Sequence, residues 1–410
     1  MSFSLSEQLS RYANLIVTFG VNVQPNDTVV LQINTDQAQL AELIVAASYA
    51  HGAAEVQVAW QNDAIARQNM LHQPEERLLA IPAYEGEKIN YWLSHHAKRI
   101  SVVSSDPNNL AGIDAQRIAK FRQAQGSVLR PLRDATQNNQ VSWTVVAAAS
   151  PAWAKLVFPE LDEQAATAKL WAAIFKTVRL DTPDYQAAWD KHITLLLEKA
   201  QWLNDQQFTE LHYTSPRTDL HIGLPAHHVW EAASSQNTQG ERFVPNMPTE
   251  EVFTAPNRNR INGYVTATKP LSYSGQTLSG MRFEFANGRV VKAQAAQGED
   301  VLQHLLNTDA GARSLGEVAL VPDPSPISQS GITFFNTLFD ENASNHLALG
   351  AAYPFSLAGG TEMDDEQLLA AGINRSLIHV DFMVGSADMD IDGIKADGTS
   401  VPVFRHGDWA

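Results

Sequence analysis

The sequence predicts a mixed α/β plus α+β protein with two domains. We expect an N-terminal α/β domain with a mainly parallel sheet over residues 1–215, and a β-rich C-terminal domain over residues 216–410. Three observations predict this: strand-like and helix-like patterns alternate in the first half, turn-separated strand pairs fill the second, and 410 residues suffice for two domains of ordinary size.

The first half reads as strands separated by helices. Its strand-like runs lie at residues 28–33, 53–60, 100–105 and 141–149, and two long helical patterns follow at 160–178 and 182–203. Apolar strands alternating with helices are typical of a parallel sheet covered by helices. The first 18 residues place polar side chains between apolar ones with helical spacing, which predicts an amphipathic helix rather than a signal peptide.

The second half reads as antiparallel hairpins. Residues 210–224, 262–275 and 279–295 each read as an antiparallel hairpin, with two strand-like runs around a turn. Asn287 and Gly288 tolerate the positive φ values that a tight hairpin turn requires. The end of the chain is also rich in strand-forming residues, so we expect a β-rich C-terminal domain.

Composition excludes several classes of function. The 29 Lys and Arg residues against 45 Asp and Glu give a net charge of −16, which repels nucleic acid and anionic membranes. The chain has no cysteine, which excludes disulfides, thiol nucleophiles and cysteine metal sites. No apolar run is long enough to span a bilayer. We therefore expect a cytoplasmic protein that binds neither nucleic acid nor membranes.

One segment near the C-terminus combines an imidazole and a carboxylate. In residues 376–385, His379 and Asp381 alternate with Ile378, Val380 and Phe382, so in a strand the two polar side chains share one face. They could bind one metal ion, or Asp381 could orient His379 from behind. A buried hydrogen-bonded pair without a metal is the alternative.

Two further segments place carboxylates among apolar residues. Glu317 lies within the apolar run 315–321, where an unpaired buried carboxylate would cost several kcal/mol. Glu250 and Glu251 precede an apolar pair. Because adjacent strand residues face opposite ways, at most one of these two glutamates points into a shared site. Each segment taken alone could equally be structural.

A fourth segment, residues 339–355, carries Glu341, His346 and Tyr353. The pattern predicts a helix over residues 343–353 that ends at Pro354, with His346 and Tyr353 on one face about two turns apart. Glu341 would lie roughly 140° around such a helix from His346, so it joins His346 only from a preceding loop. Tyr353 could also be a partly buried aromatic residue with no catalytic role.

Several carboxylates at one site would repel one another unless cations lie among them. Two divalent ions remove that penalty, and carboxylate with histidine is a ligand set that such ions accept. A pair of ions can hold a bridging hydroxide and polarise a carbonyl group, which predicts a hydrolase.

Four segments in this order resemble the aminopeptidase T and aminopeptidase S family of metallo-aminopeptidases, over nearly the whole chain: residues 246–256, 308–321, 338–355 and 379–385. The resemblance implies a two-domain, homodimeric enzyme, activated by cobalt or zinc, that removes N-terminal residues from peptides. It implies that the metal-site residues are Glu251, Glu317, His346, His379 and Asp381, that Glu341 is a further acidic position contacting a metal, and that Tyr353 is catalytic.

On this basis we expect hydrolysis by a metal-bridged hydroxide, with Glu317 between two divalent ions, which could be zinc, cobalt or manganese. Tyr353 would donate a hydrogen bond to the developing oxyanion. Glu250 is a candidate general base, or an anchor for the substrate's α-ammonium group. Two alternatives remain: a two-metal hydrolase of non-peptide amide or acyl-amino-acid substrates, and an inert oligomer that binds metal or peptide.

Overall fold

The computed structural model describes residues 3–273 and 276–410, and its described residues form two compact units. Unit 1 comprises residues 1–189 and 234–248, and unit 2 comprises residues 190–233 and 249–410. The division therefore differs from the one predicted at residue 215. It falls within helix α9 (Tyr185–Gln206), and the chain returns to unit 1 for a short segment.

The returning segment explains this difference. It forms the strands β8 (Ser235–Gln236) and β9 (Arg242–Phe243), and Asn246 forms a parallel bridge with Val145. Contacts between residues about 100 positions apart leave no local pattern in the sequence.

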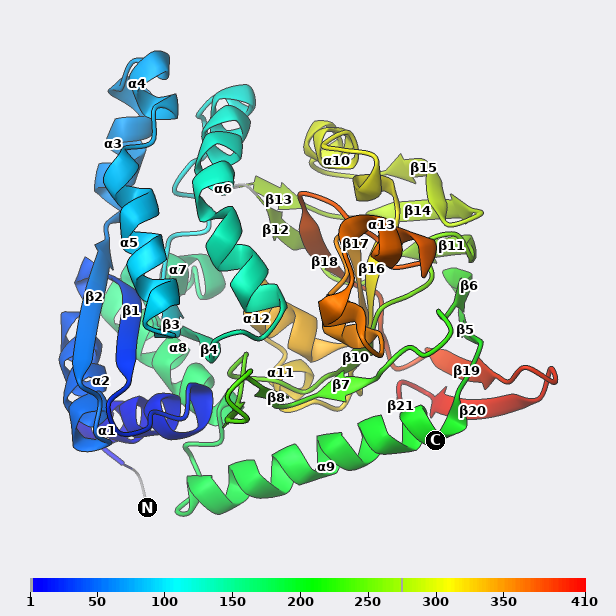
Figure 1. Cartoon of the computed structure of the whole chain (residues 1–410), viewed down its shortest axis with the longest axis horizontal. Helices are drawn as coiled ribbons and strands as arrows, with labels where there is room; N and C mark the ends of the chain where they lie inside the picture. The colour runs from blue at the N-terminus through cyan, green and yellow to red at the C-terminus, as the bar shows by residue number, and fades with distance from the viewer. Residues whose placement is uncertain (1–2, 274–275) are drawn as a thin grey trace. The chain divides into compact units, whose positions relative to one another are not determined.

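Unit 1 has the predicted parallel sheet. Its four strands lie in the order β2-β1-β3-β4, and all neighbours are parallel: β1 (Thr28–Asn34), β2 (Glu55–Gln61), β3 (Lys98–Val103) and β4 (Trp143–Ala147). The helices α5 (Ala83–Ser94) and α6 (Ala115–Gln137) pack on one face of the sheet (Figure 1) through a buried cluster that includes Val30, Trp92 and Leu132.

The remaining helices of unit 1 lie before, between and after these strands in the chain. The predicted N-terminal helix is α1 (Leu5–Leu15), which continues as a π-helical turn to Gly20, and residues 1–2 of that prediction lie outside the described residues. The others are α2 (Ala38–Ala50), α3 (Asp63–His72), α4 (Glu75–Leu79), α7 (Pro151–Val157) and α8 (Glu163–Thr177).

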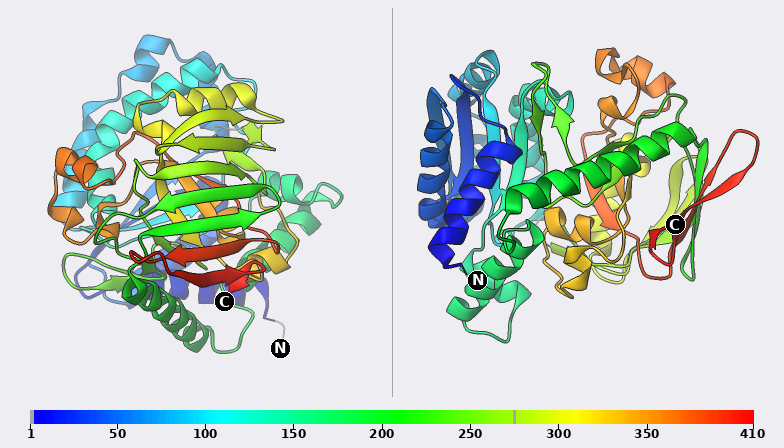
Figure 2. Two further views of the ribbon diagram at one scale, coloured as in Figure 1. Left: turned by 90° about the vertical axis from the view of Figure 1, so that its right-hand side faces the viewer. Right: turned by 90° about the horizontal axis from the view of Figure 1, so that it is seen from below.

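The described residues of unit 2 form two large antiparallel sheets and one two-stranded sheet. Figure 2 shows the larger one face on in its left view, in the order β15-β14-β11-β6-β5-β19-β20-β21. Its strands are β5 (Glu210–Ser215), β6 (Thr218–Gly223), β11 (Ile261–Thr266), β14 (Arg282–Ala286), β15 (Arg289–Gln294), β19 (Asp390–Ile394), β20 (Ser400–Arg405) and β21 (Asp408–Trp409). Asn287 and Gly288 both adopt positive φ between β14 and β15, as predicted.

The smaller sheet has five strands in the order β18-β17-β16-β10-β7. They are β7 (Glu231–Ala232), β10 (Val252–Thr254), β16 (Leu315–Leu320), β17 (His346–Gly350) and β18 (His379–Met383). Phe382 of β18 packs on Phe283 of β14, with ring centroids 4.7 Å apart, so the two sheets meet through apolar side chains. This leaves the other face of the smaller sheet for polar groups.

Short elements complete unit 2. The strand β12 (Leu271–Tyr273) pairs with β13 (Gln276–Leu278), whereas β11 pairs with β6 and β14, so the hairpin predicted over residues 262–275 is wrong; residues 274–275 of that prediction lie outside the described residues. The helices are α10 (Glu299–Leu306), α11 (Pro326–Gln329), α12 (Thr337–Asp340) and α13 (Asp365–Ala370). In the described part of the chain, no helix is both long and apolar enough to span a bilayer. The fold class is thus the predicted mixture of a parallel sheet with separate antiparallel sheets.

The helix predicted over residues 343–353 is wrong. Residues 346–350 form the strand β17, preceded by a 3₁₀ turn at Glu341–Ala343. All five residues of β17 are buried, so the strand lacks the alternation of polar and apolar residues that marks a half-exposed strand. A short apolar run of this kind resembles a helix in sequence.

Candidate metal centre and active site

Strand register places four of the six predicted ligands on one face of the five-stranded sheet. His346 lies opposite Met383, Asp381 opposite Ala348, and Ala348 opposite Glu317. Directly opposed residues of an antiparallel pair point to the same side, so His346, Asp381 and Glu317 share a face. His379 lies two residues before Asp381, so it joins them. Phe382 points to the other face, as predicted.

A β-bulge turns Glu317 toward this face. Leu315 pairs with Leu349, whereas Glu317 pairs with Ala348, so the register shifts by one residue between them. Without the shift, Leu315 and Glu317 would point the same way. Gly316 lies at the bulge, where an added Cβ atom would come within 2.2 Å of the carbonyl oxygen of Ala351. The bulge thus sends Leu315 to the apolar face and Glu317 to the polar one.

The carboxylate of Glu317 lies between the two histidines. Its Oε1 is 3.5 Å from His346 Nε2, and its Oε2 is 3.6 Å from His379 Nε2. Glu251 Oε2 is 3.1 Å from the same nitrogen of His346, and Asp381 Oδ1 is 3.4 Å from that of His379. The result is two groups of three ligand atoms that share Glu317, each with its atoms within 4.8 Å of one another.

Backbone carbonyl groups orient both imidazoles. His379 Nδ1 lies 2.7 Å from the carbonyl oxygen of Ala351, and His346 Nδ1 lies 3.3 Å from that of Ser344. Nδ1–H is therefore the donor to a carbonyl in each ring, and Nε2 faces the carboxylates. This is the arrangement in which an imidazole offers Nε2 to a metal ion while its other nitrogen is held from behind.

Burial and crowded charge shift the pKa values of these groups. Burial raises the pKa of Glu317, with contributions from Asp381 and Glu251, and it raises that of Glu341 well above its usual range. Burial by itself would lower the pKa of His379, yet Asp381 and Glu317 raise it to about 10. The cluster therefore carries a strong demand for positive charge.

Tyr353 lies beside the histidine of the second group. Its ring centroid is 5.2 Å from that of His379, and it stacks on Phe355 at 5.0 Å. Phe253, on β10, completes an aromatic cluster around Tyr353. Burial and the nearby carboxylates, Glu317 first among them, raise the pKa of Tyr353 well above its usual value, so its hydroxyl stays protonated and can donate a hydrogen bond.

Comparison with known proteins identifies the family of this chain. The family described as thermophilic metalloprotease (M29) matches residues 5–409. Aminopeptidase PepS of Streptococcus thermophilus is 53% identical over 407 residues, covering 99% of this chain and 98% of the relative. Aminopeptidase AmpS of Bacillus subtilis is 48% identical, covering 99% of both chains. The chain belongs to the M29 family.

A solved structure has the same fold as this chain. Wild-type AmpT from Thermus thermophilus superposes with a TM-score of 0.92 at 38% sequence identity, covering 99% of this chain and 100% of that one. The family resemblance drawn from the sequence is therefore confirmed, and with it a metal-dependent peptidase.

The residues of this M29 protein fit divalent cations. Four buried carboxylates, Glu251, Glu317, Glu341 and Asp381, surround only two imidazoles, so protein groups alone cannot balance the charge without protonating a carboxylate. Asp381 Oδ1 is buried and accepts no hydrogen bond from the described residues. Carboxylate oxygens with imidazole nitrogens are the donors that zinc, cobalt and manganese accept.

Besides Tyr353, two of the predicted site residues lie outside both groups of three. Glu341, in the 3₁₀ turn before β17, is buried and close enough for its charge to act on that of Asp381 and Glu251, which fits a position on a loop. Glu250 is buried too, but its Oε2 is 3.6 Å from His192 Nε2 on α9. Only Glu251 of the adjacent pair reaches the ligand groups, although both residues precede β10 rather than lie within it.

Two residues at the site were missed in the sequence. Asn342 accepts a hydrogen bond from the backbone N–H of Glu250 at 2.7 Å, and its amide lies 3.4 Å from Glu341 Oε1. His192, besides facing Glu250, lies 2.7 Å from the carbonyl oxygen of Thr249. A histidine inside a long helical pattern gives no signal of its own, and an asparagine beside an acidic residue is common in turns.

Proposed function

We propose that two divalent metal ions occupy this site and share the carboxylate of Glu317. The position of Glu317 carries the proposal, because each of its oxygens faces a different histidine. Glu251 and His346 would complete the ligands of one ion, and His379 and Asp381 those of the other. Glu341 adds negative charge beside both sets and would contact a metal.

The reaction is peptide-bond hydrolysis that releases N-terminal residues from peptides. Proteins that match this chain from end to end are named aminopeptidases, so the predicted metal-dependent aminopeptidase is confirmed. Divalent ions, when bound here, lower the pKa of water toward neutrality and polarise the scissile carbonyl group, which are the two requirements of amide hydrolysis.

The chain's own residues supply the rest of the mechanism. Tyr353 donates a hydrogen bond from its protonated hydroxyl to the oxyanion that develops as the carbonyl carbon becomes tetrahedral. Glu250, directed toward His192 rather than toward the ligand groups, is available as a general base or as an anchor for the α-ammonium group of the substrate. The aromatic rings of Phe253 and Phe355 hold Tyr353 in place.

The identity of the ions, the oligomeric state and the location of the protein extend this proposal. Zinc or cobalt, with manganese as a third candidate, suits the mixed nitrogen and oxygen ligands. We propose that the protein is a homodimer, as the family resemblance implies. We also propose that it lies in the cytoplasm, in line with a chain that lacks cysteine.

Chelation tests the function directly. A chelator should abolish cleavage of a peptide with a free N-terminus, and cobalt or zinc should restore it, while the N-acetylated form of the same peptide should stay intact throughout. Cleavage of acyl-amino acids in preference to peptides would support the alternative two-metal hydrolase. Activity that survives complete removal of metal would contradict the proposal.

A further inference from the structure

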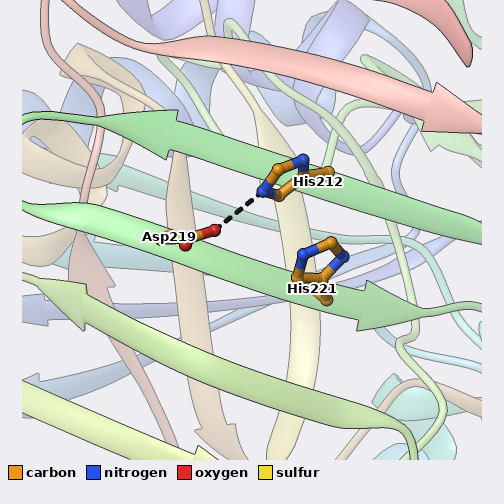
Figure 3. A group of neighbouring side chains, drawn as sticks. All are labelled: His212, Asp219 and His221. Atoms are coloured by element: carbon orange, nitrogen blue, oxygen red, sulfur yellow. Dashed lines mark hydrogen bonds and ion pairs between the residues drawn. The ribbon is translucent and has the colours of Figure 1, made fainter.

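A second group of metal-binding side chains lies on the eight-stranded sheet, away from the site described above. His212 of β5 and Asp219 and His221 of β6 offer three ligand atoms within 4.8 Å of one another. Figure 3 shows the three side chains on neighbouring strands, with His212 Nε2 and Asp219 Oδ1 joined at 2.8 Å. We propose that these residues bind a divalent transition-metal ion outside the catalytic centre.

Hairpin register creates the group. A tight turn at Pro216 and Arg217 makes Ser215 pair with Thr218, which places His212 directly opposite His221. Their rings stack with centroids 3.9 Å apart and planes inclined by 12°. Asp219 lies two residues before His221 and therefore on the same face of the sheet.

The strands hold these side chains from behind. On the opposite face, Leu211, Tyr213, Leu220 and Ile222 are fully buried, so the backbone of both strands is fixed by packing. The ligand side chains themselves are open to solvent, with 30% of His212, 56% of Asp219 and 46% of His221 exposed. An ion can therefore reach the site, and the side chains can rotate onto it.

The residues around His212 and His221 leave both imidazoles able to bind a metal ion. Glu210 Oε1 is 2.8 Å from His221 Nδ1, so it can hold that nitrogen and leave Nε2 for an ion, as outer carboxylates do at metal sites. Asp392 lies opposite His212 on β19, but its carboxylate pairs with Arg405 at 2.6 Å rather than with the imidazole of His212. Asp219 and Glu210 together supply two negative charges for a divalent cation.

The ligand types select the class of ion. Two imidazoles and one carboxylate suit zinc, copper, nickel or cobalt rather than magnesium or calcium. Bonds of about 2.0–2.2 Å place ligand atoms no more than about 4.4 Å apart, so small rotations of exposed side chains suffice to close the group around an ion. Water would fill the remaining positions.

Metal titration of single-site variants tests this proposal. The full-length enzyme, with its catalytic metals loaded, is titrated with Zn²⁺ in competition with a chromophoric chelator, alongside His212→Ala, His221→Ala and His304→Ala. His304 is an exposed histidine of the same unit outside the group, so it serves as the matched control. We expect the wild type and His304→Ala to bind one more equivalent than the other two variants, whose peptidase activity should be unchanged.

Two further measurements test whether the extra ion binds at this group: a Glu210 variant and a Cu²⁺ spectrum. Glu210→Gln should weaken binding of the extra ion about tenfold, because it removes only an outer partner. The electron paramagnetic resonance spectrum of Cu²⁺ added at one equivalent beyond the catalytic ions should show coupling to two imidazole nitrogens in the wild type, and to one in His212→Ala. Equal metal uptake by all four proteins, or the same nitrogen coupling in both spectra, would overturn the proposal.

Discussion

Unit 2 carries two clusters of histidine and carboxylate side chains that are alike in composition and opposite in exposure. On the five-stranded sheet the side chain of His346 is 1% exposed, whereas on the eight-stranded sheet that of His221 is 46% exposed. Buried carboxylates must be neutralised, because removing an ion from water costs several kcal/mol. Exposed ones remain solvated and contribute little to stability.

Burial makes compensating positive charge necessary in the first cluster, whereas the exposed cluster can do without it. In the buried cluster, the carboxylates raise the pKa of His379 to about 10 even though burial opposes it. The proposed cations would therefore stabilise the buried cluster. In the exposed cluster, an ion would be an addition to a hairpin that packing already holds. Removing a ligand should affect the two clusters very differently.

The largest effect is expected for Glu317→Gln. The amide keeps the shape of the side chain but removes the charge and replaces one ligand oxygen with an NH₂ group, so metal binding on both sides should fail. We expect kcat to fall by at least about 10³-fold and the bound metal to be lost, measured by peptide hydrolysis and elemental analysis. His212→Ala, the matched loss from the exposed cluster, should keep full activity. A Glu317→Gln enzyme with normal metal content and turnover would refute the shared role of Glu317.

Tyr353→Phe should have the next largest effect. The substitution removes one hydroxyl and leaves the stacking on Phe355, so only the hydrogen bond to the oxyanion is lost. We expect kcat to fall about 10²-fold with unchanged KM and metal content. If metal content fell in parallel with kcat, Tyr353 would act by supporting the metal site instead.

His192→Ala should lower kcat/KM about tenfold, because Glu250 loses the imidazole that lies 3.6 Å away. The variant should retain its metal, since neither residue belongs to the ligand groups. A double-mutant cycle supplies the control: in a Glu250→Gln background, already about 10²-fold less active, the same substitution should have little further effect. Additive losses would show that His192 acts independently of Glu250.

The smallest effect is expected at Glu231, on strand β7 of the five-stranded sheet. This carboxylate is half-buried and belongs to neither ligand group. Burial raises the pKa of Glu231 from 4.5 to about 7. The folded state therefore disfavours the ionised form of Glu231, and this lowers the free energy of unfolding. The loss of stability is complete above pH 7 and disappears as the pH falls from 7 toward 4.5. Glu231→Gln should raise the free energy of unfolding by about 1–2 kcal/mol at pH 8, less than the ~3 kcal/mol that a fully buried group would give.

Denaturant unfolding at pH 8 and pH 4.5 measures this difference, which should vanish at the lower pH. Peptidase activity should be unchanged in both buffers relative to the wild type. An equal stabilisation at both pH values would mean that ionisation of Glu231 is not the cause.

Much of the fold can be predicted from local patterns. The four apolar strands of unit 1 appear in the sequence as runs between helices, and Asn287 with Gly288 marks a turn that only a hairpin uses. The period of two residues in a strand is enough to place His379 and Asp381 on one face. In each case the decisive contacts lie within a few residues of one another.

The remainder depends on contacts that the sequence does not display. Strand β17 is buried on both faces, so its continuous apolar run has no strand-like alternation and resembles a helix in sequence. The bulge at Gly316 and the approach of His192 to Glu250 arise from pairing between distant segments. The exposed cluster does have a signal in the sequence, because a two-residue turn at Pro216 and Arg217 pairs His212 with His221.

Anomalous scattering from crystals of the metal-loaded enzyme tests the central claim most directly. Data collected on either side of the absorption edge of the added metal locate each ion without assumptions about its ligands. We expect two strong peaks, one beside Glu251 and His346 and the other beside His379 and Asp381, with Glu317 contacting both. A single peak, or ions that do not contact Glu317, would contradict the account.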